Sequence, residues 1–141
     1  MTSGGREVLK WLALVLMTGD HVNKALLAGQ WPGLSDAGRV VFPIFALVLA
    51  YNLVRVESIR PALVRLVIAS VIAQPVYALV FGGWWPMNVL VTFALALGMM
   101  LAWVRGRWIL AGALLVLSPM ADYGLAGVAL VFCAWEWLRG E

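Results

Sequence analysis

The stretch VLKWLALVLMTGDHVNKALLA, residues 8–28, decides how this chain must be interpreted. It is long and apolar enough for a membrane-spanning helix, yet Asp20 and His21 lie side by side within it and Lys24 follows. An ionisable side chain at membrane depth costs about 3 kcal/mol or more unless it is paired or hydrated, and such residues usually mark functional sites. We therefore take these three residues as the first candidates for chemistry.

The composition points to a small helical membrane protein. Of the 141 residues, 64% are hydrophobic and only 12% are charged, whereas a soluble domain is about half apolar. A spanning helix needs about 20 apolar residues, so five or six would occupy nearly the whole chain. We expect an all-α fold: a polytopic bundle forming a single domain over residues 1–141, multi-pass in the lipid bilayer.

Apolar runs separated by turn signals predict six transmembrane helices. The fifth is the weakest candidate, because thirteen helical residues reach about 20 Å, short of a hydrocarbon core about 30 Å thick. Five full spans are therefore the alternative. The expected ranges are Val8–Ala28, Ala37–Val56, Pro61–Phe81, Met87–Val104, Trp108–Met120 and Tyr123–Leu138.

The basic residues orient this predicted bundle. Under the six-span interpretation only Lys24 and Arg39 of the ten Lys and Arg residues fall on one side. Because Lys and Arg concentrate in cytoplasmic loops, the other side should be cytoplasmic and should hold both termini. The excess of basic residues is thus explained by topology, and we expect no nucleic-acid partner. The residues on that side are Arg6, Lys10, Arg55, Arg60, Arg65, Arg105, Arg107 and Arg139.

The remaining polar residues gather in the predicted outer half of the bundle. Five helices each contribute there, and a polar chamber open to the outside explains the clustering. Gln74 precedes Pro75, so it could instead serve backbone groups freed by the proline. The residues are Asp20, His21, Lys24, Asp36, Arg39, Gln74, Asn88, Thr92, Asp122 and Tyr123.

Helical spacing suggests distinct roles within the first helix. Asp20 and Lys24 are four residues apart and can pair, either as a purely structural ion pair or as part of a site. His21 lies about 100° around the helix from Asp20, so we expect its imidazole to be oriented by another helix, with Asp122 and Asp36 as candidates. A histidine titrates near neutral pH and can act as a base or acyl carrier. Arg39 could hold an anion, or it could lie at the outer interface as an ordinary charged residue.

Other catalytic classes lack support. The chain has no GxSxG, Walker A or HExxH motif, and its one cysteine, Cys133, has no neighbours at metal-ligand spacing. We expect no internal disulfide and no bound metal.

Two stretches resemble a known family. Leu16–His21 is similar to the MTxDH opening of the TraX family of conjugative-transfer membrane proteins, and Gly38–Ala46 resembles that family's GRxxFPIFA signature. Weaker similarities follow in the same order: Arg65-Leu66 with Gln74-Pro75, Asn88-Val89-Leu90, and Asp122-Tyr123-Gly124.

The resemblance implies acetylation of the N-terminus of a conjugative pilin subunit in the bacterial inner membrane, with acetyl-CoA as donor. It implies His21 as the catalytic base or acyl carrier, with Asp20 and Arg39 as catalytic neighbours. Substrate would contact Lys24, Gln74, Asn88, Asp122 and Tyr123. The donor's phosphates would bind inner arginines such as Arg55, Arg60, Arg65, Arg105 or Arg107, of which Arg55 and Arg65 are the first candidates.

Three other functions stay open at this point. Asp20, His21, Lys24 and Asp122 could form the relay of a proton-coupled transporter. The chain could be a pilin assembly factor that docks a partner helix, or it could carry out another pilin maturation step such as terminal ligation. An oligomer is also possible.

Overall fold

The computed structural model describes residues 3–54 and 56–140, and these residues form six α-helices and two short 3₁₀ turns. The chain divides into two compact units, residues 1–49 and 50–141. The structure thus confirms the all-α class, and the expectation of a single bundle domain stays a prediction.

The first unit is a helical hairpin made of α1 (Ser3–Leu26) and most of α2 (Pro32–Asn52). The chain leaves α1 through Ala28 and Gly29, which both have positive φ angles (49° and 74°), and this left-handed backbone ends the helix. The second helix begins at Pro32, five residues before the expected Ala37. Proline suits the first position of a helix, since its fixed φ is already helical and it lacks an N–H that would have no partner there.

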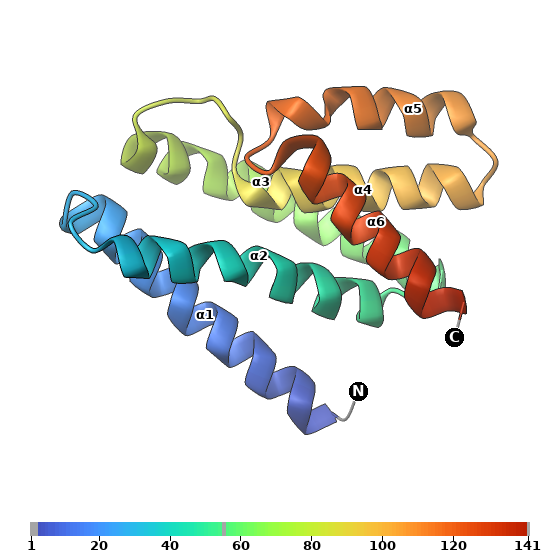
Figure 1. Cartoon of the computed structure of the whole chain (residues 1–141). Helices are drawn as coiled ribbons and strands as arrows, with labels where there is room; N and C mark the ends of the chain where they lie inside the picture. Colours follow the sequence, from blue (N-terminus) through green and yellow to red (C-terminus); the bar gives the residue numbers. More distant parts are fainter. Residues whose placement is uncertain (1–2, 55, 141) are drawn as a thin grey trace. The chain divides into compact units, whose positions relative to one another are not determined.

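The second unit is built around α4 (Val89–Val104), which contacts α3 (Ile59–Phe81), α5 (Trp108–Leu117) and α6 (Gly124–Gly140). Figure 1 shows α5 folding back antiparallel to α4. The core is formed where these helices meet, and its fully buried side chains include Leu97, Met100, Val128, Val131 and Trp135. The Trp135 indole donates a hydrogen bond of 2.8 Å to the carbonyl of Leu53. The two 3₁₀ turns, η1 (Val56–Ser58) and η2 (Ser118–Met120), precede α3 and α6.

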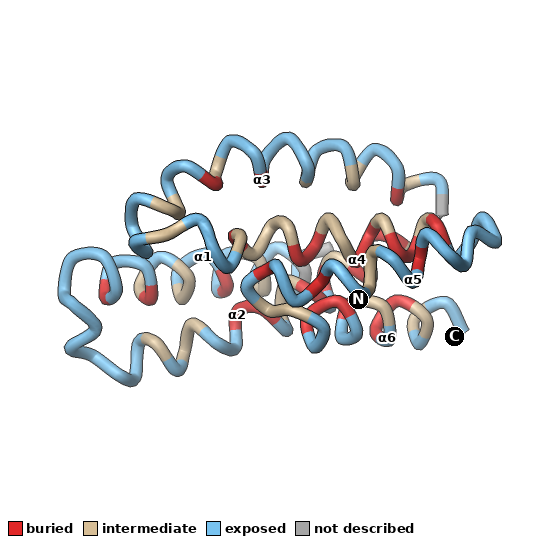
Figure 2. The backbone as a smooth tube through the Cα atoms, turned by 90° about the horizontal axis from the view of Figure 1, so that it is seen from above, coloured by how far each residue is buried: buried red, intermediate tan, exposed pale blue. Residues whose placement is uncertain are grey.

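Much of the surface of α3 is apolar and exposed. Only Ile59, Ser70 and Gln74 are buried in this 23-residue helix, whereas Ile72 and Leu79 are 70% and 85% exposed. Figure 2 shows the contrast between the exposed tube of α3 and the buried turns of α4 and α6. An exposed apolar surface of this size is more stable in contact with lipid than with water. Both α2 and α3 are long and apolar enough to cross a membrane, and we therefore describe the chain as a membrane protein.

The fifth helix is even shorter than the thirteen residues expected. Its ten residues reach about 15 Å, half the thickness of a hydrocarbon core. The residues that the sequence analysis added to its end, Ser118–Met120, form the turn η2 instead, with Pro119 inside it.

Candidate functional site

Asp20 is a buried carboxylate that pairs with Lys24 on the same face of α1. The Lys24 Nζ atom lies 2.7 Å from Asp20 Oδ2, which confirms the pairing expected from their spacing. The Lys24 side chain is 44% exposed, whereas that of Asp20 is 10% exposed. The lysine can therefore remain hydrated while the aspartate is held inside the hairpin.

Gly38 of α2 lies directly against Asp20. A Cβ atom at position 38 would approach both Cβ and Cγ of Asp20 to 2.6 Å, closer than carbon atoms in proteins come. The other carboxylate oxygen, Asp20 Oδ1, is buried and accepts no hydrogen bond within the part of the chain that the structure describes. A buried acceptor without a donor is costly, so this oxygen is suited to receive an N–H or O–H group from a bound molecule.

His21 is held by its own helix. Its Nδ1 atom lies 2.7 Å from the carbonyl oxygen of Met17, one turn earlier in α1. A carbonyl oxygen can only accept, so Nδ1 carries the proton and the lone pair of the neutral ring lies on Nε2. The expectation that another helix would supply this partner is wrong: the carbonyl four residues back in the same helix is within reach of Nδ1. The imidazole itself is exposed.

Asn23 holds the turn of the hairpin together, a role that sequence reasoning missed. This fully buried residue receives a hydrogen bond from the Trp31 N–H at Oδ1, and its amide donates to the Trp31 carbonyl and to Ser35 Oγ. Its backbone carbonyl accepts from the N–H groups of Leu27 and Gly29. The sequence did contain an indication of this role. Asn23 lies three residues after Asp20 in an apolar stretch, and a polar side chain there must find hydrogen-bond partners.

Arg39 lies immediately after Gly38 on α2, and its side chain is exposed. Its guanidinium is 3.1 Å from Asp36 Oδ1, and both side chains are more than two-thirds exposed. A pair in such a position contributes little to stability, which leaves the guanidinium able to exchange Asp36 for another anion at small cost.

In the second unit, three residues form an amide cluster, by which we mean Ser70, Gln74 and Asn88. Asn88 donates from its side chain to the Ser70 carbonyl and to Gln74 Oε1, which also accepts from the Asn88 backbone N–H. Gln74 donates in turn to the Trp84 carbonyl, and Asn88 Oδ1 caps α4 by accepting from the Leu90 N–H. The partners of Gln74 therefore come from residues 84–88 rather than from the backbone around Pro75. The oxygen and the nitrogen of both side-chain amides are thus hydrogen-bonded. Such residues are better suited to holding the surrounding chain in place than to contacting substrate.

A backbone bridge brings Asp122 and Tyr123 to this same region. The Met87 N–H donates to the Met120 carbonyl and the Asp122 N–H donates to the Met87 carbonyl, both at 2.9 Å. The Tyr123 N–H also approaches Thr92 Oγ1 at 3.4 Å. Tyr77 of α3 lies near enough to Asp122 and Tyr123 to interact with them electrostatically. The structure thus gathers Gln74, Asn88, Thr92, Asp122 and Tyr123 as the sequence analysis expected.

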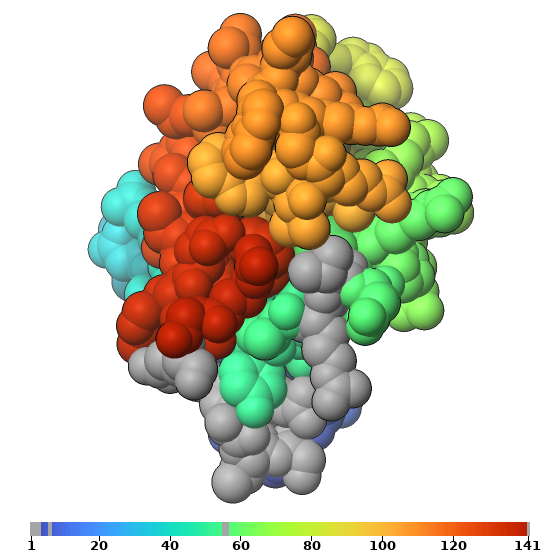
Figure 3. Space-filling view, turned by 90° about the vertical axis from the view of Figure 1, so that its right-hand side faces the viewer, coloured from blue at the N-terminus to red at the C-terminus, as the bar shows by residue number. Residues whose placement is uncertain are grey.

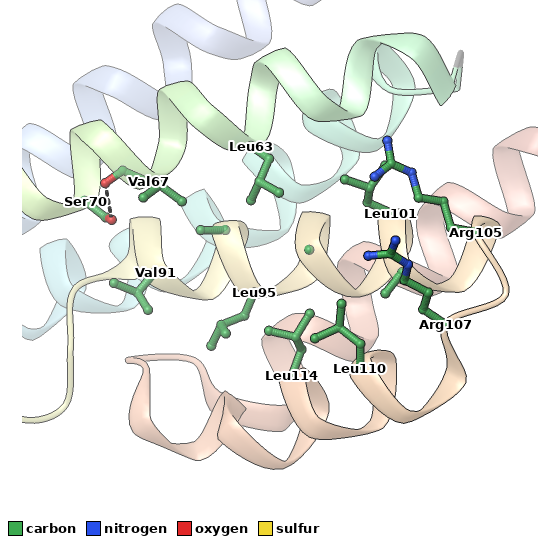
Figure 4. A pocket seen from close by; sticks show the side chains of 13 residues that line it. Leu63, Val67, Ser70, Val91, Leu95, Leu101, Arg105, Arg107, Leu110 and Leu114 are labelled. Atoms are coloured by element: carbon green, nitrogen blue, oxygen red, sulfur yellow. Dashed lines mark hydrogen bonds between the residues drawn. The ribbon is translucent and has the colours of Figure 1, made fainter.

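The arginines expected to bind the phosphates of a donor are in different places. Arg65 is exposed on α3, and Arg55 lies outside the described residues. Arg105 and Arg107 line one end of a cavity of about 490 Å³ between α3, α4 and α5. Figure 4 shows both of them at the end opposite Ser70 and Val91.

The polar residues therefore form two groups, one in each unit. We call the first the hairpin cluster: Asp20, His21, Asn23, Lys24, Gly38 and Arg39. The second comprises the amide cluster with Thr92, Asp122 and Tyr123. A single outward-facing chamber lined by both groups stays a prediction.

Comparison with known proteins identifies the family. The family model described as "TraX protein" matches residues 5–141. The chain belongs to the TraX family. Two curated relatives, both named Protein TraX, come from Escherichia coli and from its strain K12. They are 39% and 37% identical to the chain over 147 aligned positions. Each alignment covers 98% of the chain and 58% of the relative, so the chain spans less than two-thirds of the length of these proteins. No solved structure matches the chain.

The two stretches that resemble TraX motifs meet in space. Asp20 belongs to the first, Leu16–His21, and Gly38 opens the second, Gly38–Ala46. Their contact explains why a glycine is required at position 38: any side chain there would occupy the space of the Asp20 carboxylate. In this TraX-family chain the two motifs form one structural element, the contact between α1 and α2.

Proposed function

We propose that this chain is an integral-membrane acetyltransferase that transfers an acetyl group from acetyl-CoA to the N-terminus of a conjugative pilin subunit in the bacterial inner membrane. Membership of the TraX family supports the setting. The observation that carries the chemistry is the His21–Met17 hydrogen bond, because Nδ1 donates in it and the lone pair of a neutral imidazole is then on Nε2. The adjacent residue, Asp20, has a buried carboxylate oxygen without a donor among the described residues.

The proposed topology has six membrane segments with both termini in the cytoplasm. It is supported by the six helices, by the exposed apolar surface of α3, and by the placement of eight of ten basic residues on one side. The short α5 crosses only part of the bilayer in this arrangement.

In the proposed reaction, His21 acts as the base. Its Nε2 atom removes a proton from the attacking α-amino group as nitrogen bonds to the acetyl carbon, and the carbon–sulfur bond of the thioester then breaks. The proton passes to the departing thiolate, so the products are an N-acetyl group and free CoA. In a two-step form of the same reaction, Nε2 itself bonds to the acetyl carbon first and the amine then attacks the acetyl-imidazole.

Neighbouring residues would prepare the acceptor. We assign Asp20 Oδ1 to the N–H groups of the acceptor amine, since that oxygen is buried without a donor. Lys24 would hold the Asp20 carboxylate in place through the 2.7 Å ion pair. Arg39 would stabilise the oxyanion that develops on the acetyl carbonyl after its exposed pair with Asp36 opens.

Asp122 and Tyr123 are proposed to contact the pilin terminus, while Gln74 and Asn88 hold the segment that positions them. Arg65 and Arg55 are proposed to bind the phosphates of CoA, the chemistry for which arginine is best suited.

The deciding experiment is intact-mass analysis of a pilin subunit co-expressed with the wild-type chain or with His21→Ala. We expect the mass of one acetyl group to be added with the wild type and to be absent with the variant, because general base catalysis contributes about 100-fold or more. Val22→Ala, a truncation of the exposed neighbouring side chain, is the matched control and should retain acetylation.

The other outcomes separate the competing functions. No acetyl group with the wild type would exclude this reaction on that subunit and favour an assembly or ligation role. Proton flux driven by a pH gradient in vesicles, without any change in pilin mass, would favour the transporter. Acetylation that survives His21→Ala at equal membrane levels would show that the histidine is structural.

A further inference from the structure

The cavity between α3, α4 and α5 is not used by the proposed reaction, and it has a distinctive distribution of charge. Apart from Arg105, Arg107 and Ser70, its lining is made of aliphatic side chains and one glycine. The Ser70 hydroxyl already donates a hydrogen bond of 2.8 Å to the carbonyl of Val67. The only polar groups available along the cavity are thus the two guanidinium groups at one end.

The two arginines have no acidic partner among the described residues. Neither Arg105 nor Arg107 takes part in a salt bridge among residues 3–54 and 56–140, and both are exposed. The turn between α4 and α5 places them two residues apart around Gly106, whose φ of 67° allows the chain to reverse there. Figure 3 looks onto this end of the second unit, where the α4–α5 connection (orange) lies next to α6 (red). An anion at this end would meet two positive charges.

The length of the cavity along α4 is sufficient to cross one leaflet of a bilayer. Along α4 the lining extends from Val91 to Arg105, about 21 Å at the rise of an α-helix. Half of a hydrocarbon core is about 15 Å thick, so a chain that begins at the arginines would remain beside apolar lining to the depth of the bilayer centre. Two lining side chains, Val67 and Leu110, are about 45% exposed, which leaves the cavity open to lipid.

From these observations we infer that the cavity is a binding site for an anionic diacyl phospholipid, with the headgroup phosphate on Arg105 and Arg107 and one acyl chain along α4. A pair of basic residues at the end of a cleft between membrane helices is suited to such headgroups. The lining disfavours the pantetheine arm of CoA, whose amide groups would find no hydrogen-bond partners along the apolar walls. This site is independent of the acetyl-transfer proposal and requires only that the chain lies in a membrane.

The test is native mass spectrometry of the full chain in detergent, titrated with dioleoyl phosphatidylglycerol or dioleoyl phosphatidylcholine. We expect the anionic lipid to bind about tenfold more tightly than the zwitterionic one, since each basic residue near a phosphate adds to the preference. The double variant Arg105→Gln/Arg107→Gln should remove this preference. Arg60→Gln/Arg65→Gln removes the same charge from exposed arginines that do not line the cavity, and it should retain the preference.

A second pair of variants tests the acyl chain. Ala94→Phe places a ring in the cavity and should weaken the binding of both lipids, whereas Ala69→Phe adds the same ring on the exposed surface of α3 and should not. Thermal unfolding of the wild type gives an additional measure, because a ligand that binds only the folded state raises its unfolding temperature.

Three results would overturn the inference. Equal affinity for the two lipids would show that the arginines do not select a headgroup. An equal loss with Arg60→Gln/Arg65→Gln would reduce the effect to overall surface charge. Displacement of the bound phosphatidylglycerol by acetyl-CoA, with loss of CoA binding in Arg105→Gln/Arg107→Gln, would assign the cavity to the donor.

Discussion

The hairpin cluster and the amide cluster differ in whether their buried polar atoms have hydrogen-bond partners. In the amide cluster, Gln74 and Asn88 use both ends of their side chains in hydrogen bonds, and neither residue carries a charge. In the hairpin cluster, Asp20 is charged and leaves one buried oxygen without a donor. A satisfied neutral network stabilises a fold, whereas an unsatisfied charged one raises the free energy of the empty site. The difference favours a structural role for the amide cluster and supports placing the proposed chemistry in the hairpin cluster.

The largest effect on stability is expected from Asn88→Ala. The substitution removes the cap of α4 and leaves the Ser70 carbonyl and Gln74 Oε1 without their donor, so the free energy of unfolding should fall by about 3 kcal/mol. Denaturation of the purified chain in mixed micelles would measure it. Asn88→Ser, which can still cap the helix, should lose about half as much. Equal losses in the two variants would mean that the cap contributes little and that the hydrogen bonds donated to Ser70 and Gln74 carry the stability.

The largest effect on activity without loss of stability is expected from Asp20→Asn. The amide keeps the size of the carboxylate but removes its charge, so we expect acetylation of the pilin terminus to slow about 100-fold, as when one electrostatic group is removed from an active site. Unfolding in mixed micelles should change little. A drop in stability as large as that of Asn88→Ala would contradict the contrast between the clusters.

Gly38→Ala tests the contact that joins the two motifs. The added methyl group would lie 2.6 Å from two carbon atoms of Asp20, and overpacking of this kind costs about 2 kcal/mol. The control is Gly33→Ala, at an α2 position where an added Cβ meets nothing within 4 Å. Thermal unfolding of the two variants should differ clearly, and equal unfolding temperatures would show that the hairpin opens easily at Gly38.

The smallest effect is expected from Lys24→Gln. The Lys24 side chain is 44% exposed, and ion pairs in such positions contribute less than about 1 kcal/mol. Acetylation should decline less than with Asp20→Asn when the two rates are measured side by side. A larger loss than that of Asp20→Asn would make the lysine, rather than the carboxylate, the residue that contacts substrate.

The fold was predictable where periodicity and spacing carry the information. Apolar runs located all six helices, and the distance of four residues between Asp20 and Lys24 predicted their ion pair. The start of α2 was missed because Pro32 was taken as part of a turn, although proline also suits the first position of a helix.

The site was less predictable, because its decisive contacts join residues that are distant in sequence or use backbone atoms. The approach of Gly38 to Asp20 depends on how two helices cross, which no local pattern reveals. The partner of His21 is a backbone carbonyl, and every residue has one, so sequence reasoning looked instead for a side chain. The hydrogen bonds of Asn23 depend on the geometry of a turn.

The ten-residue helix α5 has a consequence for the membrane itself. With about 15 Å of helix against about 30 Å of hydrocarbon, this flank of the protein is too short for the surrounding lipid. Lipids respond to such hydrophobic mismatch by thinning locally, at a modest cost for each ångström. In the proposed topology, the η2 turn and Asp122 therefore lie where the bilayer is locally thinned, and the proposed peptide substrate has less hydrocarbon to cross there.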